Sequence, residues 1–590
     1  MSSSTLADRL ARTVAGTPDA VALRDGRTTL TYRQLWERTA TIGAALRARL
    51  GKDGMVALLR PRDLTQALVL VACVRDGLPV LVLDPGVPVE RLRQIVAPIP
   101  EGVVVAADDA PGPRLGPGWT PADLPTVDGG SGRLDGGTGP VDGDRHDPIV
   151  VIATSGSSGR PKLVALEHAG LDNRIMWAVR EFDLTRRDVF VHCSAPGFDF
   201  GLFEVLCPLV LGATLVLPDP DAHRDPEALL AAVREHAVTV LHGTPSLLRQ
   251  LSRLPGLADT NLRIVFSGGE ALTTGLAATL ARATGAEVVN EYGPTETTVD
   301  SLAYRCPADG GDGDLVPLGV PIDRTGAYVA DPDAEGRGEL LIGGAGVARG
   351  YYGDPRATAA AFVPDESTPG GRRYRTGDLV RRDGDGLFHF LGRGDDQIKV
   401  RGVRIELAEV RAAYRRHPLV LDVVAGGVTT PDGTRLAVAV EVADDTVPAA
   451  ELRRFTGVYL PRAFQPDRLD VTESLPRLPN GKVDRQAVER GWAAAFADVP
   501  EQPAAPRART AEVDLLGTLL RVAGEELGLE RVEPSDDFFA LGGHSLLAGR
   551  VVSVVEAETG RSIPLRAFFN ASSFAEIIEL TEAGWARDGV

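Results

Sequence analysis

Residues 153–162, ATSGSSGRPK, place hydroxyls, glycines and one lysine directly after the apolar run 147–153. Backbone N–H groups and hydroxyls in such a turn can wrap a polyphosphate, and a lysine adds a compact positive charge. The Walker A pattern G-x-x-x-x-G-K-[ST] is absent, so this is not a P-loop. A flexible Ser/Gly turn is the alternative, but the preceding strand favours phosphate binding. The candidate residues are Thr154, Ser155, Gly156, Ser157, Ser158, Gly159 and Lys162.

Lysine is rare in this chain: of 63 basic residues only Lys52, Lys162, Lys399 and Lys482 are lysines. Arginine therefore serves wherever a generic positive charge suffices, and a retained lysine indicates a need for a compact ammonium. Chance survival under a codon bias explains any single lysine equally well. That explanation weakens because three of the four fall in glycine-rich or charged motifs.

The segment DDFFALGGHSLLAGR (536–550) places Ser545 after a Gly-Gly turn, at the expected start of a helix. A serine there is exposed to a modifying enzyme. It is also a good helix N-cap, and the two interpretations are compatible.

Composition excludes several classes of function. A chain of 590 residues is expected to form several domains, and its net charge of −18 argues against binding a nucleic-acid backbone. The four cysteines show no C-x-x-C pairing, which argues against a disulfide framework or structural zinc. The start MSSSTLADRL has no signal-peptide pattern and the run ALVLVACV is too short to span a bilayer. We therefore expect a cytoplasmic protein.

Short apolar runs followed by polar turns and helical stretches recur along the first 400 or so residues, for example VTVLHG–TPSLLRQL and LRIVFSGGE–ALTTGLAATLA. This pattern predicts an α/β layered fold with its site at the carboxyl ends of the strands. The Gly/Pro/Asp-rich residues 110–148 indicate a surface loop or a crossing between subdomains, and the Pro/Ala-rich residues 498–510 indicate an interdomain linker. Apolar residues at helical spacing beyond it predict a small helical bundle.

Ten segments, in order, resemble the adenylation domains of nonribosomal peptide synthetases, within the adenylate-forming superfamily. They are LTYRQL, VRDGLPVLVLDP, the phosphate loop, FDFGLFE, NEYGPTET, GELLIGGAGVARGYY, YRTGDL, GRGDDQIKVRGVRIEL, YLPRAFQP and LPNGKVDR. The segment around Ser545 resembles a peptidyl carrier site. The resemblance implies an N-terminal adenylation subdomain of layered α/β sheets (1–394) and a small, mobile α+β C-terminal subdomain (395–497). A linker (498–509) and an all-α helical-bundle carrier domain (510–585) complete the expected chain.

The resemblance also assigns roles. Glu296 would bind Mg²⁺ on the ATP phosphates, although a simple helix N-terminal acid is the alternative. Lys482 would reach the substrate carboxylate and the bridging oxygen as pyrophosphate leaves. Asp395 would be the hinge about which the small subdomain rotates, unless it is only an exposed loop acid. The remaining nucleotide-binding residues would be Gly269, Asn290 and Tyr292 at the adenine side, Thr295, and Asp378 with Arg393 at the ribose.

The family's substrate pocket maps onto Asp199, Phe200, Phe203, His242, Phe266, Gly268, Glu291, Val299, Asp300 and Lys482. Asp199 and Lys482 would hold the α-ammonium and carboxylate of an amino acid. Three phenylalanines make the cavity small, while buried carboxylates require a donor or a cation. This predicts a small polar substrate resembling serine, threonine or diaminopropionate, with a hydroxylated aryl amino acid second. If Glu291 points away, the pocket is merely small and apolar.

The overall hypothesis is a two-step ligase that uses ATP, Mg²⁺ and a 4′-phosphopantetheine on Ser545 to make an aminoacyl adenylate and then a thioester, in nonribosomal-peptide or antibiotic biosynthesis. Expected partners are a phosphopantetheinyl transferase and a downstream condensation domain or tailoring enzyme, with dependence on an MbtH-like protein left open and neither nucleic acid nor membrane involved. An acyl- or aryl-CoA ligase is the alternative enzyme, and a silent scaffold would have lost Glu296, Asp378 or Lys482. The glycine-rich GGAGVARG is followed by YYGDP instead of a helix, so NAD binding is rejected.

Overall fold

A computed structural model describes most of the chain. The described residues are 5–26, 28–51, 54–106, 113–122, 124, 144–156, 160–222, 225–310, 314–430, 433–443, 447–478, 483–497, 514–527, 531–538, 541, 543, 545–561, 563–564, 567–568, 571 and 573–588. They form two compact units, residues 1–409 and 410–590. The first unit carries nearly all of the predicted site.

One sheet of the first unit has seven strands, in the order β18-β8-β7-β4-β3-β5-β6. Its bounds are β3 (Met55–Leu59), β4 (Val80–Leu83), β5 (Gly102–Val105), β6 (Trp119–Pro121), β7 (Pro148–Thr154), β8 (Lys162–Glu167) and β18 (Gly350–Tyr351). The central strands β3, β4 and β5 are parallel and buried at every residue. Their continuous apolar sequences reflect burial on both faces of the sheet.

A second sheet has nine strands, in the order β15-β14-β13-β12-β11-β9-β10-β1-β2. Its bounds are β1 (Val21–Asp25), β2 (Thr28–Thr31), β9 (Val189–Val191), β10 (Thr214–Leu217), β11 (Val240–Gly243), β12 (Ile264–Ser267), β13 (Glu287–Tyr292), β14 (Leu302–Arg305) and β15 (Val320–Pro321). Strands β11, β12 and β13 run parallel in direct register. Their carboxyl ends therefore meet at one edge, where an open α/β sheet binds its ligand.

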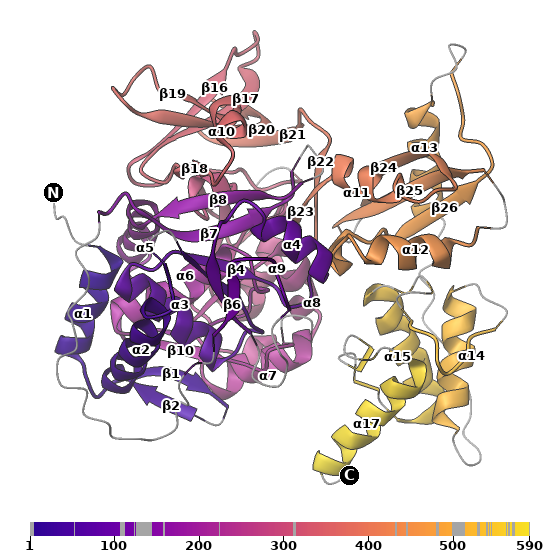
Figure 1. Cartoon of the computed structure of the whole chain (residues 1–590), viewed down its shortest axis with the longest axis horizontal. Helices are drawn as coiled ribbons and strands as arrows, with labels where there is room; N and C mark the ends of the chain where they lie inside the picture. Colours follow the sequence, from indigo (N-terminus) through magenta and orange to yellow (C-terminus); the bar gives the residue numbers. More distant parts are fainter. Residues whose placement is uncertain are drawn as a thin grey trace. The chain divides into compact units, whose positions relative to one another are not determined.

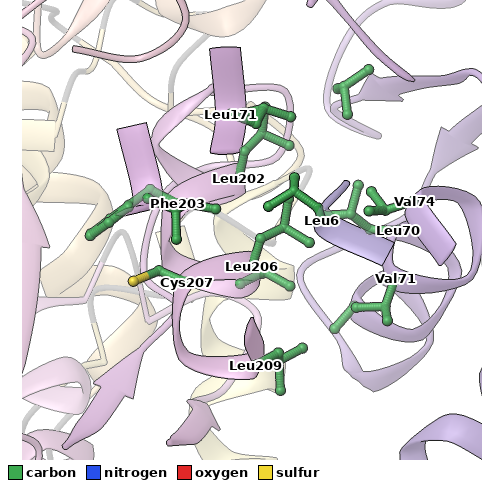
Figure 2. Close-up of a cluster of buried hydrophobic side chains, with 14 of the residues drawn as sticks. Leu6, Leu70, Val71, Val74, Leu171, Leu202, Phe203, Leu206, Cys207 and Leu209 are labelled. Atoms are coloured by element: carbon green, nitrogen blue, oxygen red, sulfur yellow. The ribbon is translucent and has the colours of Figure 1, made fainter. Parts of the chain in front are cut away.

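Helices fill the space between these two sheets and cover their outer faces (Figure 1). The inner helices α1 (Leu6–Gly16), α2 (Tyr32–Arg47), α3 (Leu64–Asp76), α5 (His168–Glu181) and α6 (Phe200–Leu211) share one core with strands of both sheets. Figure 2 shows α3 leucines and valines, such as Leu70 and Val74, near Leu202 and Leu206 of α6 and Leu6 of α1. Both α3 and α6 are apolar almost all round, as helices buried on every side must be. The outer helices are α4 (Val89–Val96), α7 (Pro226–Glu235), α8 (Pro245–Ser252) and α9 (Thr274–Thr284).

A smaller sheet and a hairpin complete the first unit. The sheet comprises β16 (Thr325–Ala330), β17 (Arg337–Gly344), β19 (Phe362–Pro364), β20 (Arg372–Arg382) and β21 (Phe388–Arg393), with α10 (Pro355–Ala361) beside it. The hairpin pairs β22 (Gln397–Val400) with β23 (Val403–Glu406) and turns through Arg401 and Gly402, both at positive φ. Helix α11 (Leu407–Tyr414) follows it.

The second unit contains a three-stranded sheet, β24 (Val420–Thr430), β25 (Gly433–Val442) and β26 (Arg468–Thr472), with helices α12 (Ala449–Gly457) and α13 (Arg485–Ala497). Trp492 of α13 packs on β24 so closely that a Cβ on Gly426 would lie 2.8 Å from its ring. Helices α14 (Leu515–Leu527), α15 (Ser545–Thr559) and α17 (Phe574–Asp588) enclose a separate apolar core. The α/β fold with a helical carrier region is confirmed, while the predicted linker 498–509 lies outside the described residues.

Within the described part of the chain, the helices are all too short or too polar to cross a bilayer.

Candidate active site

The phosphate loop is held at both ends. Thr154 ends β7 and Lys162 begins β8, and the two residues are register partners in the antiparallel pair. Ser155 Oγ donates a 2.9 Å hydrogen bond to the backbone carbonyl of Arg404, in the β22–β23 hairpin. A Cβ on Gly156 would lie 1.9 Å from the carbonyl oxygen of Arg160, so this turn requires glycine. The predicted residues Ser157, Ser158 and Gly159 lie outside the described residues.

Glu296 lies in the short 3₁₀ helix Thr295–Thr297 that follows β13, and it is fully buried. Tyr351 Oη donates to its Oε1 at 2.9 Å, and Arg404 Nη1 donates to its Oε2 at 2.8 Å. Burial by itself raises the pKa of Glu296, but Arg404 and these hydrogen bonds bring it below its ordinary value. Glu296 is therefore an ionised carboxylate, and it already binds one cation, the guanidinium of Arg404.

Magnesium fits this position. Mg²⁺ is bound through one or two carboxylates together with substrate phosphates. Glu296 supplies such an oxygen ligand, and Thr154 contributes a buried Oγ1 that makes no hydrogen bond within the described part of the chain. Lys162, from the same loop, places its Nζ 5.1 Å from the ring centroid of Tyr351, which bonds to Glu296.

Three of the predicted nucleotide residues form one hydrogen-bonded network, Tyr292, Asp378 and Arg393. Tyr292, at the end of β13, donates its hydroxyl to Asp378 Oδ2 of β20, and Arg393 of β21 donates to Asp378 Oδ1. Burial raises the pKa of Tyr292 well above its ordinary value, so its hydroxyl stays protonated as a donor. Asn290 is buried in β13, and its Nδ2 donates to the carbonyl of Pro317 at 2.8 Å. Gly269, at φ +83°, follows β12 beside them.

Asp395 follows this network in the chain. Its two carboxylate oxygens accept from Arg393 Nε at 2.7 Å and Nη2 at 2.8 Å, a bidentate pair. Burial raises its pKa, but Arg393 more than compensates, and the net pKa is low. Lys399, two residues beyond Gln397, is half-buried with its Nζ 5.8 Å from the ring centroid of Tyr292. The β22–β23 hairpin thus brings a second rare lysine to the nucleotide residues.

The predicted pocket residues come together around His242, the third residue of β11. Phe200 of α6 stacks on its imidazole with ring centroids 4.2 Å apart. Phe203 and Phe266 meet it edge-on at 5.9 and 6.0 Å. A Cβ on Gly268 would lie 3.0 Å from Phe200 Cζ, so the phenyl ring packs directly on the strand end. The three predicted phenylalanines therefore pack around one imidazole ring.

Asp199 lies immediately before α6 and is buried. Burial raises its pKa to about 7, against a hydrogen bond from Thr295 that lowers it. Thr295 adjoins Glu296, and both residues act on the pKa of Asp199, so the predicted ammonium acceptor lies near the carboxylate on the phosphate side. The next residues of that turn, Thr298 and Val299, have φ of 63° and 68°. Such values are strained for β-branched residues and cluster at functional sites.

Arg174 of α5 is the functional residue that sequence reasoning missed. Its Nη2 donates to Glu291 Oε1 at 2.7 Å and its Nε donates to Asp300 Oδ2 at 2.9 Å. Its guanidinium carbon lies 4.2 Å from the ring centroid of Phe203. One signal was present: Arg174 falls among Leu171, Ile175 and Ala178 on the apolar stripe of the helix. A charge at such a position requires a buried partner.

The two predicted residues of the second unit are Lys482 and Ser545, and the structure describes the side chain of neither. Lys482 lies outside the described residues. Ser545 is the first residue of α15, which agrees with the predicted helix start, but its side chain is not described.

Comparison with known proteins agrees with these observations. Residues 10–352 match the family described as AMP-binding enzyme, and residues 517–581 match the phosphopantetheine attachment site. The chain is 35% identical to phosphinothricin tripeptide synthetase PhsB of Streptomyces viridochromogenes, covering 94% of this chain and 47% of that protein. It is 33% identical to enterobactin synthase component F of Escherichia coli strain K12, covering 98% of this chain and 46% of that protein. The chain therefore spans less than half the length of these relatives.

Solved structures give the same result. The chain is similar to holo-PA1221, a protein of adenylation and carrier domains bound to a vinylsulfonamide inhibitor, with a TM-score of 0.78 and 25% identity over 98% of this chain and 96% of that one. It is also similar to NpsA-ThdA, an artificially fused adenylation–carrier didomain from Klebsiella oxytoca, with a TM-score of 0.71 and 26% identity over 80% and 94% of the two chains.

Proposed function

Since the chain belongs to the AMP-binding enzymes, as an adenylation domain of the nonribosomal peptide synthetase type followed by a carrier domain, we propose that it activates an amino acid with ATP and loads it onto its own carrier domain. One observation carries the proposal. Asp199, suited to an α-ammonium, is buried close enough to Glu296 for the charge of Glu296 to raise its pKa, and Glu296 itself carries the charge suited to a cation on the phosphates.

In the first step the amino-acid carboxylate attacks the α-phosphorus of ATP, and pyrophosphate leaves. The phosphate loop from Thr154 to Lys162 holds the phosphates, Tyr292 and Asn290 contact the adenine, and Asp378 with Arg393 binds the ribose hydroxyls. Mg²⁺, held by Glu296, neutralises phosphate charge when bound. Lys482 stabilises the charge that develops on the bridging oxygen.

In the second step a thiol on the carrier domain attacks the carbonyl carbon of the aminoacyl adenylate, a thioester forms, and AMP leaves. The 4′-phosphopantetheine, attached to Ser545, supplies the accepting thiol when present. Asp395 acts as the hinge about which the small C-terminal subdomain rotates between the first and the second step. Its bidentate pair with Arg393 connects this hinge to the ribose-binding residues. A phosphopantetheinyl transferase, a downstream condensation domain or tailoring enzyme, and an MbtH-like protein are the proposed partners.

The proposed substrate is a small polar amino acid resembling serine, threonine or diaminopropionate, with a hydroxylated aryl amino acid second. Three phenylalanines around His242 support the small size, and Glu291 and Asp300 support the polar character.

ATP–pyrophosphate exchange over all proteinogenic amino acids and diaminopropionate tests the proposal. We expect amino-acid-dependent exchange, followed by a mass increase of the holo carrier domain equal to one aminoacyl group. Exchange only with carboxylic acids that lack an α-amino group, and product formation with free coenzyme A, would instead identify an acyl-CoA ligase.

A further inference from the structure

Arg174 carries a permanent positive charge and contacts predicted pocket residues that would surround the side chain of the amino-acid substrate. Its side chain is 1% exposed and bonds to Glu291 and Asp300, whose side chains are 0% and 1% exposed. The rings of Trp177, Phe203 and Phe266 lie within 6 Å of its guanidinium carbon. A guanidinium packed on aromatic faces and bonded to two carboxylates has little freedom to leave.

The charges of this cluster balance without a ligand. Burial raises the pKa of Glu291 well above its ordinary value, which favours the protonated, uncharged form of this side chain. Two carboxylates with one proton then carry one negative charge, which Arg174 neutralises. The expectation that these carboxylates need a cation or donor from the substrate was therefore incomplete, because the chain supplies the cation itself.

Although the charges of the cluster balance, several of its buried polar atoms make no hydrogen bond within the described residues. Neither ring nitrogen of His242 makes a hydrogen bond within the described part of the chain, although the ring is buried and its Nε2 lies 3.6 Å from Glu291 Oε2. The other polar atoms of the cluster that have no hydrogen bond there are Ser267 Oγ, Arg174 Nη1, Glu291 Oε2 and Asp300 Oδ1. Burial also lowers the pKa of His242, so its imidazole is neutral, with one donor and one acceptor nitrogen. A buried polar group without a partner is costly, and one that lies in a binding pocket is suited to a ligand.

A metal ion is a poor alternative. His242, Glu291 and Asp300 could each offer one ligand atom, all within 4.8 Å of one another. Arg174, however, already bonds to both carboxylates, so a divalent cation would have to lie against the guanidinium.

We propose that Arg174 determines substrate specificity by neutralising Glu291 and Asp300, so that the pocket accepts an uncharged, hydroxyl-bearing side chain at His242 and rejects an ammonium there. The inference rests on the proposed function and narrows its substrate class to serine- or threonine-like acids. Phe200, stacked on His242 and packed against Gly268, keeps the hydroxyl close to the substrate Cβ.

The test compares kcat/KM for serine, threonine, alanine and 2,3-diaminopropionate in pyrophosphate exchange, using the full chain. For the wild type we expect serine or threonine to exceed alanine and diaminopropionate by about tenfold or more, because a site built to bond a hydroxyl rejects analogues that cannot make that bond. Arg174→Met keeps much of the side-chain volume but removes the charge. Its preference should shift towards diaminopropionate by about tenfold or more, because the carboxylates lose their cation, while the KM for ATP stays unchanged.

Arg180→Met is the matched control, since Arg180 lies on the same helix in an exposed pair with Asp323. Arg174→Lys should retain the wild-type order of substrates, and a melting curve verifies folding of each variant. An unchanged ratio in folded Arg174→Met overturns the inference, as does a wild type that prefers diaminopropionate or an apolar acid. If Arg174→Met does not fold, the inference is decided by the order of the four substrates for the wild type and by whether Arg174→Lys keeps that order. If no amino acid supports pyrophosphate exchange, the proposed function itself is wrong. If exchange occurs but Arg174→Met has the substrate preference of the wild type, only the inference about Arg174 is wrong.

Discussion

Arg404 donates to Glu296 across 2.8 Å, at a carboxylate that has no exposed surface. The same residue accepts, through its backbone carbonyl, the hydroxyl of Ser155 in the phosphate loop. The hairpin β22–β23 thus places its own cation on the carboxylate proposed for Mg²⁺. Arg404 and Mg²⁺ are expected to compete for Glu296, so that the hairpin occupies this position only when metal and phosphates are absent.

Arg404→Ala should lower the Mg²⁺ concentration that gives half-maximal pyrophosphate exchange. A hydrogen bond to a charged group contributes about 1.5–3 kcal/mol, which corresponds to about tenfold or more in apparent affinity. The measurement is an exchange titration with Mg²⁺ at saturating ATP. Arg381→Ala, an exposed arginine of β20, is the control and should titrate as the wild type does. An unchanged midpoint in folded Arg404→Ala would show that the two cations do not compete.

Asp199 should give the reaction a pH dependence near neutrality. Its pKa of about 7 means that the carboxylate needed for the α-ammonium is mostly protonated at pH 6 and mostly ionised at pH 8. The kcat/KM for the amino acid should therefore rise about tenfold between pH 6 and 8, because this parameter reports the free enzyme. Asp199→Asn should have a much lower kcat/KM for the amino acid, and its remaining activity should not rise between pH 6 and 8.

The same shift has a consequence for stability. The folded-state pKa of Asp199 is above its unfolded value, so the ionised carboxylate destabilises the fold increasingly as pH rises from about 4 to 7. Asp199→Asn should therefore melt at a higher temperature than the wild type at pH 8, and the difference should vanish towards pH 4. A constant difference across this range would contradict the raised pKa.

The α/β layers and most site positions could be predicted because they depend on local patterns. Apolar runs such as Met55–Leu59 specify buried strands, and a turn follows each of them. Because β12 and β13 pair in parallel, the strand ends at Ser267 and Tyr292 lie at the same edge of the sheet. The resemblance then named side chains at those ends. The structure bonds Tyr292 to Asp378, and it places Glu296 in the short turn that follows the strand of Tyr292.

Arg174 and Arg404 could not be predicted in the same way. Arg174 lies 117 residues from Glu291 in the chain, and its pairing depends on how α5 packs between the sheets. Arg404 lies 108 residues from Glu296, and its contact depends on where the β22–β23 hairpin rests. With 59 arginines in the chain, residue type alone singles out neither. Buried ion pairs are set by tertiary packing, which a local pattern does not encode.

Ser545→Ala should abolish both the mass increase on phosphopantetheinylation and all covalent loading of the amino acid. Pyrophosphate exchange should stay near the wild-type rate, because the first unit carries the described adenylation residues and α15 belongs to another unit. Intact-protein mass spectrometry after treatment with a phosphopantetheinyl transferase and coenzyme A measures the first effect. Ser553→Ala, on the same helix, is the control and should load normally. Loading of the Ser545 variant would show that another serine carries the arm.

Lys482→Ala should slow adenylate formation and spare the transfer step. The lysine follows Gly481 in a chain that otherwise uses arginine, which favours a compact ammonium directed at one developing charge. Removing such a charge should reduce pyrophosphate exchange about 10²–10³-fold, by analogy with the loss of an oxyanion-hole donor. Transfer from supplied aminoacyl-AMP to the holo carrier domain should continue near the wild-type rate, because the lysine stabilises charge that develops as pyrophosphate leaves, and pyrophosphate has already left before this step. Arg485→Ala, three residues away, controls for disturbance of α13. Equal losses in both half-reactions would assign Lys482 a structural role, and undiminished exchange would remove it from the site.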